Sequence, residues 1–476
     1  MVVAAPASGS GKTTVATGLV GALRRVGHRV APFKVGPDYI DPGYHGLAAG
    51  RPGRNLDPVL VGTERVVPLY RHGARGCDLA VVEGVMGLFD GRIDPDHAGP
   101  VAEGSTAQVA SLLGAPVLLV VDARGHSQSL AALLHGFATF DSAVRLGGVI
   151  LNRVGSVRHD QVLRAACERV GLAVLGSLPR MAELEVPSRH LGLIPAVEHG
   201  AAATAAVAAM TDLVAAHVDL HAVAALASST VSGPAWDPFE AVRGPDIAGG
   251  SQAFAESAVD PALDTVDGGP LIAIAGGSAF TFGYAEHREL LLAAGARVVV
   301  FDPLRDELPT GTAGLVLPGG FPEEHAAELA ANTGLLRAVA EAARRGMPVH
   351  AECAGLLYLT RSLDGHPMAG VVSADAAFGS RLTLGYRDAV VLADSPLWRA
   401  GERVRGHEFH RTRLITATSD VSAWGWRDNA DERVREGALI RNVHASYLHT
   451  HPAGNPEAIT RFVRVATDYA SSRVVG

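Results

Sequence analysis

The chain has 476 residues, enough for two or three domains that each bury a core of their own. Apolar residues make up 48% and charged residues 19%, which is typical of a globular protein and excludes a disordered one. The net charge is −8 and the sequence contains no block of lysine and arginine, so we expect no nucleic-acid partner.

The three cysteines, Cys77, Cys167 and Cys353, are widely spaced, so neither a disulfide framework nor a metal-binding knuckle is predicted. The N-terminus leads directly into a functional loop without the charged segment typical of a signal peptide. The most apolar long stretch, residues 200–227, is rich in alanine but interrupted by polar residues, which predicts one or two helices and no membrane span. We therefore expect a cytoplasmic protein.

The first half of the chain alternates short apolar runs with helical patterns, which indicates βαβ units and a parallel sheet. The strands predicted there are Val2–Ala5, Arg29–Lys34, Leu79–Glu83, Val117–Asp122, Gly148–Leu151 and Ala173–Leu178. Residues 228–270 shift to serine, glycine and proline, which indicates a linker or a long surface connection.

A second α/β pattern follows this linker. The strands predicted there are Leu271–Ala275, Arg297–Phe301, Gly314–Leu317 and Pro348–Ala351, and antiparallel segments are expected at 382–392, 405–412 and 437–443. The predicted fold class is therefore α/β, with two domains that each hold a mostly parallel sheet flanked by helices.

A glycine-rich loop, residues 5–14 (APASGSGKTT), lies between the first strand and a helical pattern over Val15–Val26. Its backbone N–H groups would surround phosphates at the N-terminus of the helix. Lys12 would reach the β- and γ-phosphates, and the Thr13 hydroxyl would bind Mg²⁺. The residues expected to bind the nucleotide are Gly9, Ser10, Gly11, Lys12, Thr13, Thr14 and Asn152.

Two polar residues at strand ends are open to two interpretations each. Glu83 ends an apolar strand, where a second carboxylate for Mg²⁺ belongs, but it could be an ordinary acidic residue at a strand end. Asn152 follows another strand, where it could contact a nucleotide base or serve as a structural turn residue.

The loop after the second strand, residues 34–42 (KVGPDYIDP), holds Asp38, Tyr39 and Asp41 between two prolines. It would lie at the carboxyl edge of the sheet, where ligands bind in such folds. Because Asp-Pro turns are also common on surfaces, the loop chemistry alone leaves its role open.

Cys353 lies where an apolar strand, Met347–His350, turns sharply into a helical pattern. This arrangement is typical of a nucleophile elbow, which we expect to lower the pKa of the thiol and to expose it. The alternative is a buried core cysteine, the more common fate of a single cysteine.

Three segments carry a resemblance to a known family. The loop at 5–14, the loop at 34–42 and residues 81–91 (VVEGVMGLFDG) closely resemble cobyrinic acid a,c-diamide synthase and its hydrogenobyrinic acid counterpart. The wider N-terminal half is similar to dethiobiotin synthetase. The resemblance divides the chain into a P-loop synthetase domain (1–200), a helical segment and linker (201–270) and a class I glutamine amidotransferase domain (271–470).

The resemblance implies a synthetase reaction in the N-terminal half, with ATP and Mg²⁺. A substrate carboxylate would be phosphorylated to an acyl phosphate, which ammonia converts to an amide. The residues implied in substrate binding are Asp38, Tyr39, Asp41 and Asp90, and those implied in metal binding are Thr13, Asp38 and Glu83.

In the C-terminal half the resemblance implies that Cys353 is the glutaminase nucleophile and His449 its base. Backbone N–H groups of Gly320 and Ala354 would form the oxyanion hole. Class I amidotransferases carry a glutamate two residues after this histidine, but here His451 stands there. The segment 406–410 (GHEFH) could supply the group that orients His449. Glycine is also more usual than alanine at position 354.

The implied small-molecule partners are a corrin macrocycle, glutamine and ATP, with a possible homodimer and no membrane partner. Nothing in the chain is typical of a cobalt ligand set, so the sequence leaves open whether the ring carries cobalt. One alternative is an amidoligase for other tetrapyrrole carboxylates, such as cobyric acid synthase, although the 34–42 loop favours the a,c type. Another is a P-loop switch that senses glutamine, suggested by the missing glutamate and by Gly276-Gly277-Ser278 in place of a basic–acidic pair.

Overall fold

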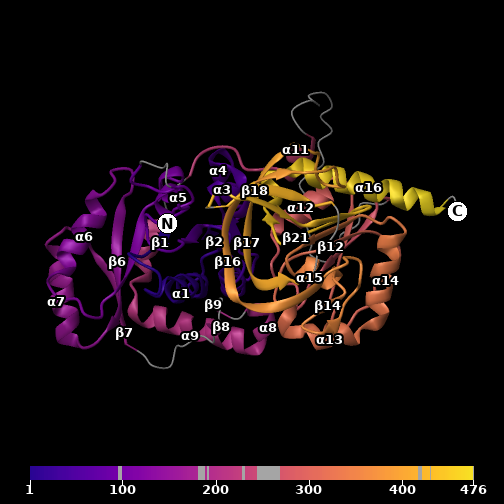
Figure 1. Ribbon diagram of the computed structural model, residues 1–476. Helices are drawn as coiled ribbons and strands as arrows, with labels where there is room; N and C mark the ends of the chain where they lie inside the picture. Colours follow the sequence, from indigo (N-terminus) through magenta and orange to yellow (C-terminus); the bar gives the residue numbers. More distant parts are fainter. Residues whose placement is uncertain are drawn as a thin grey trace. The chain divides into compact units, whose positions relative to one another are not determined.

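The computed structural model describes residues 1–94, 99–180, 188–189, 192–193, 195–227, 231–243, 268–415, 421–428 and 430–474. The chain forms two compact units, Met1–Trp236 and Asp237–Gly476 (Figure 1). Each unit contains a mostly parallel sheet flanked by helices, which confirms the predicted α/β fold class.

The first unit is built on a seven-stranded parallel sheet with the strand order β3-β2-β4-β1-β5-β6-β7. The strands are β1 (Val2–Ala4), β2 (Val30–Val35), β3 (Arg54–Leu56), β4 (Leu79–Glu83), β5 (Val117–Asp122), β6 (Leu146–Val154) and β7 (Val174–Pro179). The central strands β1, β2 and β4 are buried along their whole length, because helices cover both faces of such a sheet. Only β3 was not predicted, since three residues are too few to show a period.

The helices of the first unit connect these strands. They are α1 (Lys12–Arg25), α2 (Asp41–Ala49), α3 (Pro58–Val61), α4 (Thr63–Gly73), α5 (Thr106–Leu112), α6 (Leu130–Thr139), α7 (Val157–Glu168), α8 (Ala196–His199), α9 (Ala201–His217) and α10 (Leu220–Ala227). Strand β8 (Ser188–Arg189) pairs antiparallel with β9 (Gly192–Leu193).

The alanine-rich stretch that was expected to be helical forms α9 and α10, both within the first unit. Helix α9 packs closely on α1. A Cβ at Gly18 would collide with the Met210 carbonyl, and one at Gly21 would collide with Thr211. The small residues on both helices therefore let the two backbones approach closely. None of the described helices is both long and apolar enough to cross a bilayer.

The sheet order places the three segments of the first unit that were predicted to bind ligands at one edge. Strand β1 lies next to β4, which lies next to β2, and in this register Glu83 is level with Val3 and with Lys34. Because the strands are parallel, the P-loop after β1, the loop after β2 and Glu83 at the end of β4 all meet at the carboxyl edge.

The second unit contains a six-stranded sheet with the order β11-β10-β12-β13-β21-β20, in which only the edge strand β20 is antiparallel to its neighbour. Its strands are β10 (Leu271–Ala275), β11 (Arg297–Phe301), β12 (Thr312–Leu317), β13 (Val349–Glu352), β20 (Ala438–Ile440) and β21 (Val443–Ser446). Its helices are α11 (Pro238–Arg243), α12 (Ala285–Ala293), α13 (Ala326–Ala331), α14 (Thr333–Arg344), α15 (Ala354–Leu359) and α16 (Pro456–Val474), with short 3₁₀ helices η1 (Pro322–His325) and η2 (Pro452–Gly454).

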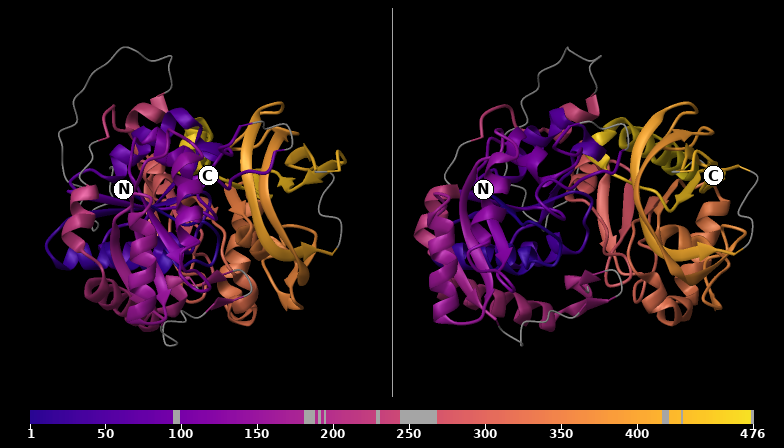
Figure 2. Two further views of the ribbon diagram at one scale, coloured as in Figure 1. Left: turned by 90° about the vertical axis from the view of Figure 1, so that its left-hand side faces the viewer. Right: turned by 60° about the vertical axis from the view of Figure 1, so that its left-hand side comes forward.

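A second sheet in this unit is dominated by two long antiparallel strands, β16 (Asp375–Val391) and β17 (Arg403–Leu414). Figure 2 shows the two strands curving together along their length. They contain the segments predicted as antiparallel at 382–392 and 405–412. The sheet is completed by β14 (Ser362–Leu363), β15 (His366–Pro367), β18 (Trp424–Arg427), β19 (Arg433–Glu436) and β22 (His449–Thr450).

Candidate active sites

The P-loop of the first unit has the backbone that phosphate binding requires. Gly9 and Gly11 have φ values of 77° and 94°, which L-residues rarely adopt, and α1 begins directly after them. The Ser10 hydroxyl donates to the Ala7 carbonyl at 2.8 Å and closes the loop. The Lys12 ammonium donates to the Met86 carbonyl at 2.5 Å, which links the P-loop to the segment that follows β4.

Asn152 forms a hydrogen bond with the backbone of the P-loop. Its side-chain amide donates to the Ser10 carbonyl at 2.9 Å, and its Oδ1 accepts from the Arg153 N–H. The Arg153 guanidinium donates to the Gly9 carbonyl at 2.8 Å and to Asp122 at 2.5 Å. Both polar ends of the Asn152 side chain therefore contact backbone groups. Arg153 was not singled out from the sequence, since an arginine after a strand is common.

The buried Lys34 forms ion pairs with the carboxylates at the edge of the sheet. Lys34 Nζ lies 2.6 Å from Asp41 Oδ2, 3.0 Å from Glu83 Oε1 and 3.9 Å from Asp38 Oδ2, and its side chain is only 5% exposed. Lys34 begins the 34–42 loop, but no local pattern in the sequence indicates a role for it. Its central position follows from the pairing of β2 with β4, which is a tertiary contact.

This arrangement separates the pKa values of the two buried carboxyl groups. Burial alone would raise the pKa of Glu83, but Lys34 and His45 outweigh it and lower the pKa to about 2. Burial and the neighbouring Asp38 raise the pKa of Asp41 to about 7, against the opposing effect of Lys34. Burial would lower the pKa of Lys34, but Asp41 and Glu83 hold it above its usual range. Glu83 and Lys34 are therefore both charged at neutral pH.

His45 is a further member of this cluster that the sequence did not reveal. Its Nε2 lies 2.6 Å from Glu83 Oε2, and its Nδ1 lies 2.9 Å from the Thr17 hydroxyl. The ring thus links α2 to α1 and holds the second Glu83 oxygen. A single histidine in a helix carries no signal for such a contact.

Thr13 and Glu83 are arranged so that both could bind one Mg²⁺ ion. The Thr13 hydroxyl donates to Glu83 Oε1 at 2.7 Å, close to the roughly 2.9 Å that separates neighbouring ligands in an octahedral Mg²⁺ shell. Among the described residues, no three acidic, histidine or cysteine side chains form a metal site by themselves. The donor set therefore fits an ion that is shared with phosphates and water.

The four residues predicted to bind the substrate make different contacts near Thr13 and Glu83. Thr13 also donates to Asp41 at 3.2 Å, so Asp41 is the second carboxylate beside Thr13. Asp38 Oδ1 instead accepts from the backbone N–H groups of Ile40 and Asp41, which forms the turn of the loop. Tyr39 is buried within this loop. Asp90 accepts from the Gly87 N–H at 2.9 Å, close enough to Lys12 to act on its charge.

Cys353 in the second unit has the strained backbone of a nucleophile elbow. Its φ is 48° and its ψ is −97°, and it lies between β13 and the first residue of α15. Its N–H donates to the Ser446 carbonyl of the neighbouring strand at 2.7 Å. Ala354 does not have a positive φ, so alanine fits where glycine is more usual.

The predicted oxyanion groups lie beside the thiol. Burial, reinforced by Glu323, raises the pKa of Cys353 above its usual range, while the N–H groups of Ala354 and Gly320 favour the thiolate and oppose this effect. Both N–H groups therefore act on the thiolate from close by, and the oxyanion of a substrate carbonyl attacked by this sulfur would form next to them. The expectation that the elbow exposes the thiol and lowers its pKa is wrong here, because Cys353 is only 2% exposed and burial dominates.

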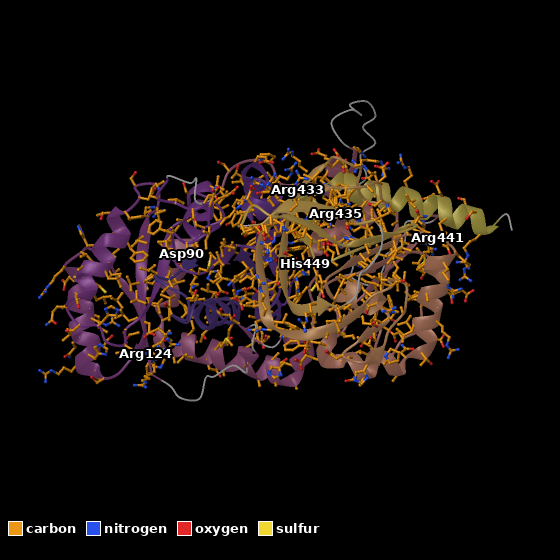
Figure 3. The ribbon with its side chains drawn as sticks, viewed as in Figure 1. Asp90, Arg124, Arg433, Arg435, Arg441 and His449 are labelled. Carbon is orange, nitrogen blue, oxygen red and sulfur yellow. The ribbon has the colours of Figure 1, made fainter. Side chains whose placement is uncertain are left out.

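His449 is buried against Gly319, the residue that precedes Gly320. It lies in β22, opposite His407 of β17, and has no exposed surface. A Cβ at Gly319 would collide with its Cε1, so Gly319 has to be glycine while the adjacent Gly320 faces Cys353. Burial lowers the pKa of His449 to about 4, although Glu352 acts in the opposite direction. Figure 3 labels His449 in the second unit and Asp90 in the first.

Two family models match the chain. Residues 1–194 match the CobQ/CobB/MinD/ParA nucleotide binding domain, and residues 271–456 match the CobB/CobQ-like glutamine amidotransferase domain. A protein of Mycobacterium tuberculosis named hydrogenobyrinate a,c-diamide synthase is 62% identical over 463 residues, which cover 97% of each chain. The chain belongs to the a,c-diamide synthase family.

Other members of the a,c-diamide synthase family are similar along the same length. The hydrogenobyrinate a,c-diamide synthase of Streptomyces coelicolor is 58% identical, with 97% of this chain and 96% of the relative covered. The cobyrinate a,c-diamide synthase of a Synechococcus species is 39% identical, with 98% and 97% covered. The chain is accordingly an enzyme of the ligase class that combines a nucleotide-binding domain with a glutamine amidotransferase domain.

Proposed function

We propose that this enzyme amidates the a and c acetate carboxylates of hydrogenobyrinic acid, with ATP and glutamine as co-substrates. The observation that carries the proposal is the 62% identity over 97% of the chain to a relative named for this activity. Identity to the relatives named for the cobalt-containing ring is 39% to 41%. We accordingly propose the metal-free ring as the preferred substrate and the cytoplasm, which supplies ATP and glutamine, as the location.

The first unit would activate the substrate. A substrate carboxylate oxygen attacks the γ-phosphorus of ATP, ADP leaves and an acyl phosphate forms. The P-loop N–H groups and Lys12 bind the phosphates and stabilise the charge that develops on their oxygens. Burial and the nearby Lys34 lower the pKa of Lys12, yet Glu83 and Asp41 favour its charged form.

We assign Thr13 and Glu83 to the metal site, because their oxygens lie 2.7 Å apart at the edge of the P-loop. Mg²⁺ held there would neutralise phosphate charge during transfer. Asp41, which lies beside Thr13 and Lys34, would accept a proton from the ammonia nitrogen when the amide forms. Asp38, Tyr39 and Asp90 would position the acetate side chain.

The second unit would supply ammonia from glutamine. His449 takes the Cys353 proton as the sulfur attacks the amide carbon, and then gives that proton to the leaving nitrogen. The Gly320 and Ala354 N–H groups stabilise the oxyanion. Water then releases glutamate and returns the proton to the thiol. Ammonia attacks the acyl phosphate carbon and inorganic phosphate leaves.

The proposal is tested by the mass of the product. The protein is given ATP, Mg²⁺ and glutamine with either hydrogenobyrinic or cobyrinic acid. Two successive losses of about one mass unit, each an exchange of hydroxyl for amine, are expected, with the metal-free ring consumed faster. The variant Lys12→Met is the control and should form no product. No exchange on either ring, or amidation of other side chains, would contradict the proposal.

A further inference from the structure

The glutaminase site has no acidic residue two positions after His449, where class I amidotransferases carry a glutamate. His451 stands there, and its Nδ1 accepts from the Ala453 N–H at 3.2 Å as the cap of η2. Its ring lies against Tyr284, with the ring centroids 4.1 Å apart. His451 is therefore held by the turn and by an aromatic neighbour. A histidine base needs a group that fixes its ring and its tautomer, so another residue has to do this for His449.

Glu352 reaches His449 from a different direction. It directly precedes Cys353 at the end of β13, and its Oε2 lies 3.8 Å from His449 Nδ1. Its other oxygen, Oε1, accepts from the Thr450 N–H at 3.1 Å and from the Thr450 hydroxyl at 2.9 Å. His350 Nε2 lies 3.2 Å from the same oxygen. One carboxylate oxygen is thus held in place and the other faces the base.

We infer that Glu352 is the positioning residue of this glutaminase, which replaces the missing glutamate by orienting His449 through Nδ1. With Nδ1 facing a carboxylate, Nε2 is the ring nitrogen that remains for the Cys353 proton. The distance of 3.8 Å would shorten in the substrate complex, as catalytic hydrogen bonds commonly do. The inference rests on the glutaminase half of the proposed function.

The charge of Glu352 fits this role. Burial would raise the pKa of Glu352, but His350 and His449 outweigh it and lower the pKa to about 2. The carboxylate is therefore ionised throughout the neutral range and stabilises the imidazolium that forms when His449 accepts the thiol proton. Thr450 also connects the two residues, because it donates two hydrogen bonds to Glu352 and directly follows His449 in the chain.

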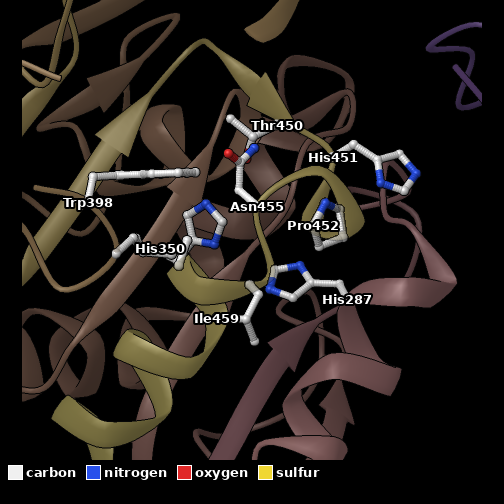
Figure 4. Close-up of a pocket in the computed structure, with 10 residues that line it drawn as sticks. His287, His350, Trp398, Thr450, His451, Pro452, Asn455 and Ile459 are labelled. Carbon is white, nitrogen blue, oxygen red and sulfur yellow. The ribbon is translucent and has the colours of Figure 1, made fainter. Parts of the chain in front are cut away.

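The surroundings of Glu352 keep most of its side chain away from water, because only 12% of that side chain is exposed. A small cavity beside it is lined by Phe282, Tyr284, His287, His350 and Thr450. Figure 4 shows the adjoining cavity, in which the rings of His287 and His350 lie close together, with their centroids 5.5 Å apart and their planes tilted by 52°. Burial lowers the pKa of His287 to about 3, so this ring is neutral. A carboxylate in such surroundings acts more strongly on a neighbouring imidazole than it would in water.

Glu408 is the competing carboxylate, since it belongs to the segment that the sequence suggested. Its Oε2 accepts from Arg387 at 2.7 Å, and its Oε1 lies 3.5 Å from His410 Nε2. Both oxygens of Glu408 therefore already contact side chains of the long strands, Arg387 of β16 and His410 of β17. The titratable groups that act on His449 are Glu352, Glu408, His350, His407 and His410, and those that act on Glu352 are His287, His350 and His449.

The test compares Glu352→Gln with Glu408→Gln in the full chain. Glutamine hydrolysis is measured without the macrocycle, and ammonia-driven amidation is measured separately, so that failure of the ring assay does not affect the result. Glu352→Gln should lower kcat for glutamine about 100-fold with little change in KM, because the amide leaves the shape intact but removes the charge. The acidic limb of its pH profile should move to lower pH, since the carboxylate raises the pKa of His449.

Labelling of Cys353 by a diazoketone analogue of glutamine gives a second readout and should slow by a similar factor in Glu352→Gln. The inference is overturned if Glu352→Gln keeps kcat within about threefold of the parent, or if Glu408→Gln has the larger effect. It is also overturned if the acidic limb of the pH profile does not move.

Thr450 provides a test that does not depend on the folding of the glutamate variants. Thr450→Val keeps the shape of the side chain but loses the hydroxyl that holds Glu352, whereas Thr450→Ser keeps the hydroxyl. We expect Thr450→Val to lower kcat for glutamine about tenfold and Thr450→Ser to leave it near the parent value. Equal effects of the two variants would overturn the inference.

Discussion

Lys34 and Glu83 in the first unit are buried together as groups of opposite charge, whereas Cys353 and His449 in the second unit are buried as neutral groups. In the first unit a lysine within 3.0 Å of two carboxylates compensates for the loss of water. In the second unit burial dominates, so it raises the pKa of the thiol and lowers the pKa of the imidazole to about 4.

The difference shows how burial serves two kinds of chemistry. In the first unit the ion pairs of Lys34 are already present in the protein without a ligand. In the proposed mechanism, a thiol and an imidazole that stay neutral in the free protein would form their ion pair by proton transfer within the site, where Glu352 and the oxyanion N–H groups would stabilise the charges. The first site is therefore charged in advance, and the second becomes charged during the reaction.

The largest effect should come from removal of the nucleophile. Cys353→Ala should lower glutamine-driven amidation by at least about 10³-fold, because no other group in the site replaces the thiolate. Ammonia-driven amidation should remain, since the charged cluster of the first unit is unchanged. Steady-state rates with glutamine or with ammonium chloride check this prediction. Equal loss of both activities would show that the two sites do not divide the reaction as proposed.

Removal of the buried cation should destabilise the first unit. Lys34→Met leaves Asp41 and Glu83 buried without their partner, which should lower the free energy of unfolding by about 3–5 kcal/mol. The control is Arg25→Met, which breaks the exposed pair with Asp212 and should cost no more than about 1 kcal/mol. Urea denaturation measures both. Equal losses in Lys34→Met and Arg25→Met would mean that the ion pairs of Lys34 contribute little to the free energy of unfolding.

The neutral histidines of the second unit predict a loss of stability in acid. Burial lowers the pKa of four histidines from 6.5 to about 3 or 4, namely those of His287, His407, His444 and His449. The unfolded chain binds these protons first, so the contribution is fully present above pH 6.5 and is lost as the pH falls toward 4. Each histidine contributes roughly 1.4 kcal/mol per pH unit within this window.

Tryptophan fluorescence checks this acid sensitivity, because three of the four tryptophans lie in the second unit. Unfolding free energies would be measured between pH 7.5 and 5. The variant His444→Gln should reduce the slope with pH, whereas the same change at the exposed His366 should not. A slope that is unchanged in His444→Gln would contradict the assignment of neutral buried histidines.

The smallest effect concerns Asn152. Because its amide holds the Ser10 carbonyl, Asn152→Ala should raise KM for ATP about tenfold while the preference for ATP over GTP stays the same. Kinetics with the two nucleotides measure both quantities. A changed preference would instead support the interpretation that Asn152 contacts the base.

Much of this architecture was predictable from local patterns. The bounds predicted for β4, β5, β10 and β11 agree with the structure, because parallel strands appear in a sequence as short apolar runs. Other predictions depended on contacts that no local pattern contains. The thiol of Cys353 was expected to be exposed with a lowered pKa, yet the surrounding strands bury it and raise the pKa.

The sequence by itself determined the two sheets, the P-loop with Lys12 and Thr13, the elbow at Cys353 and the family. These features depend on spacings within a few residues, which a sequence displays directly. Only the tertiary structure decided that Lys34 lies between the carboxylates and that Glu352 faces His449. Both contacts join residues brought together by strand pairing. The energies that stabilise them come from burial and charge at distances of 3 to 4 Å, which the order of residues along the chain does not specify.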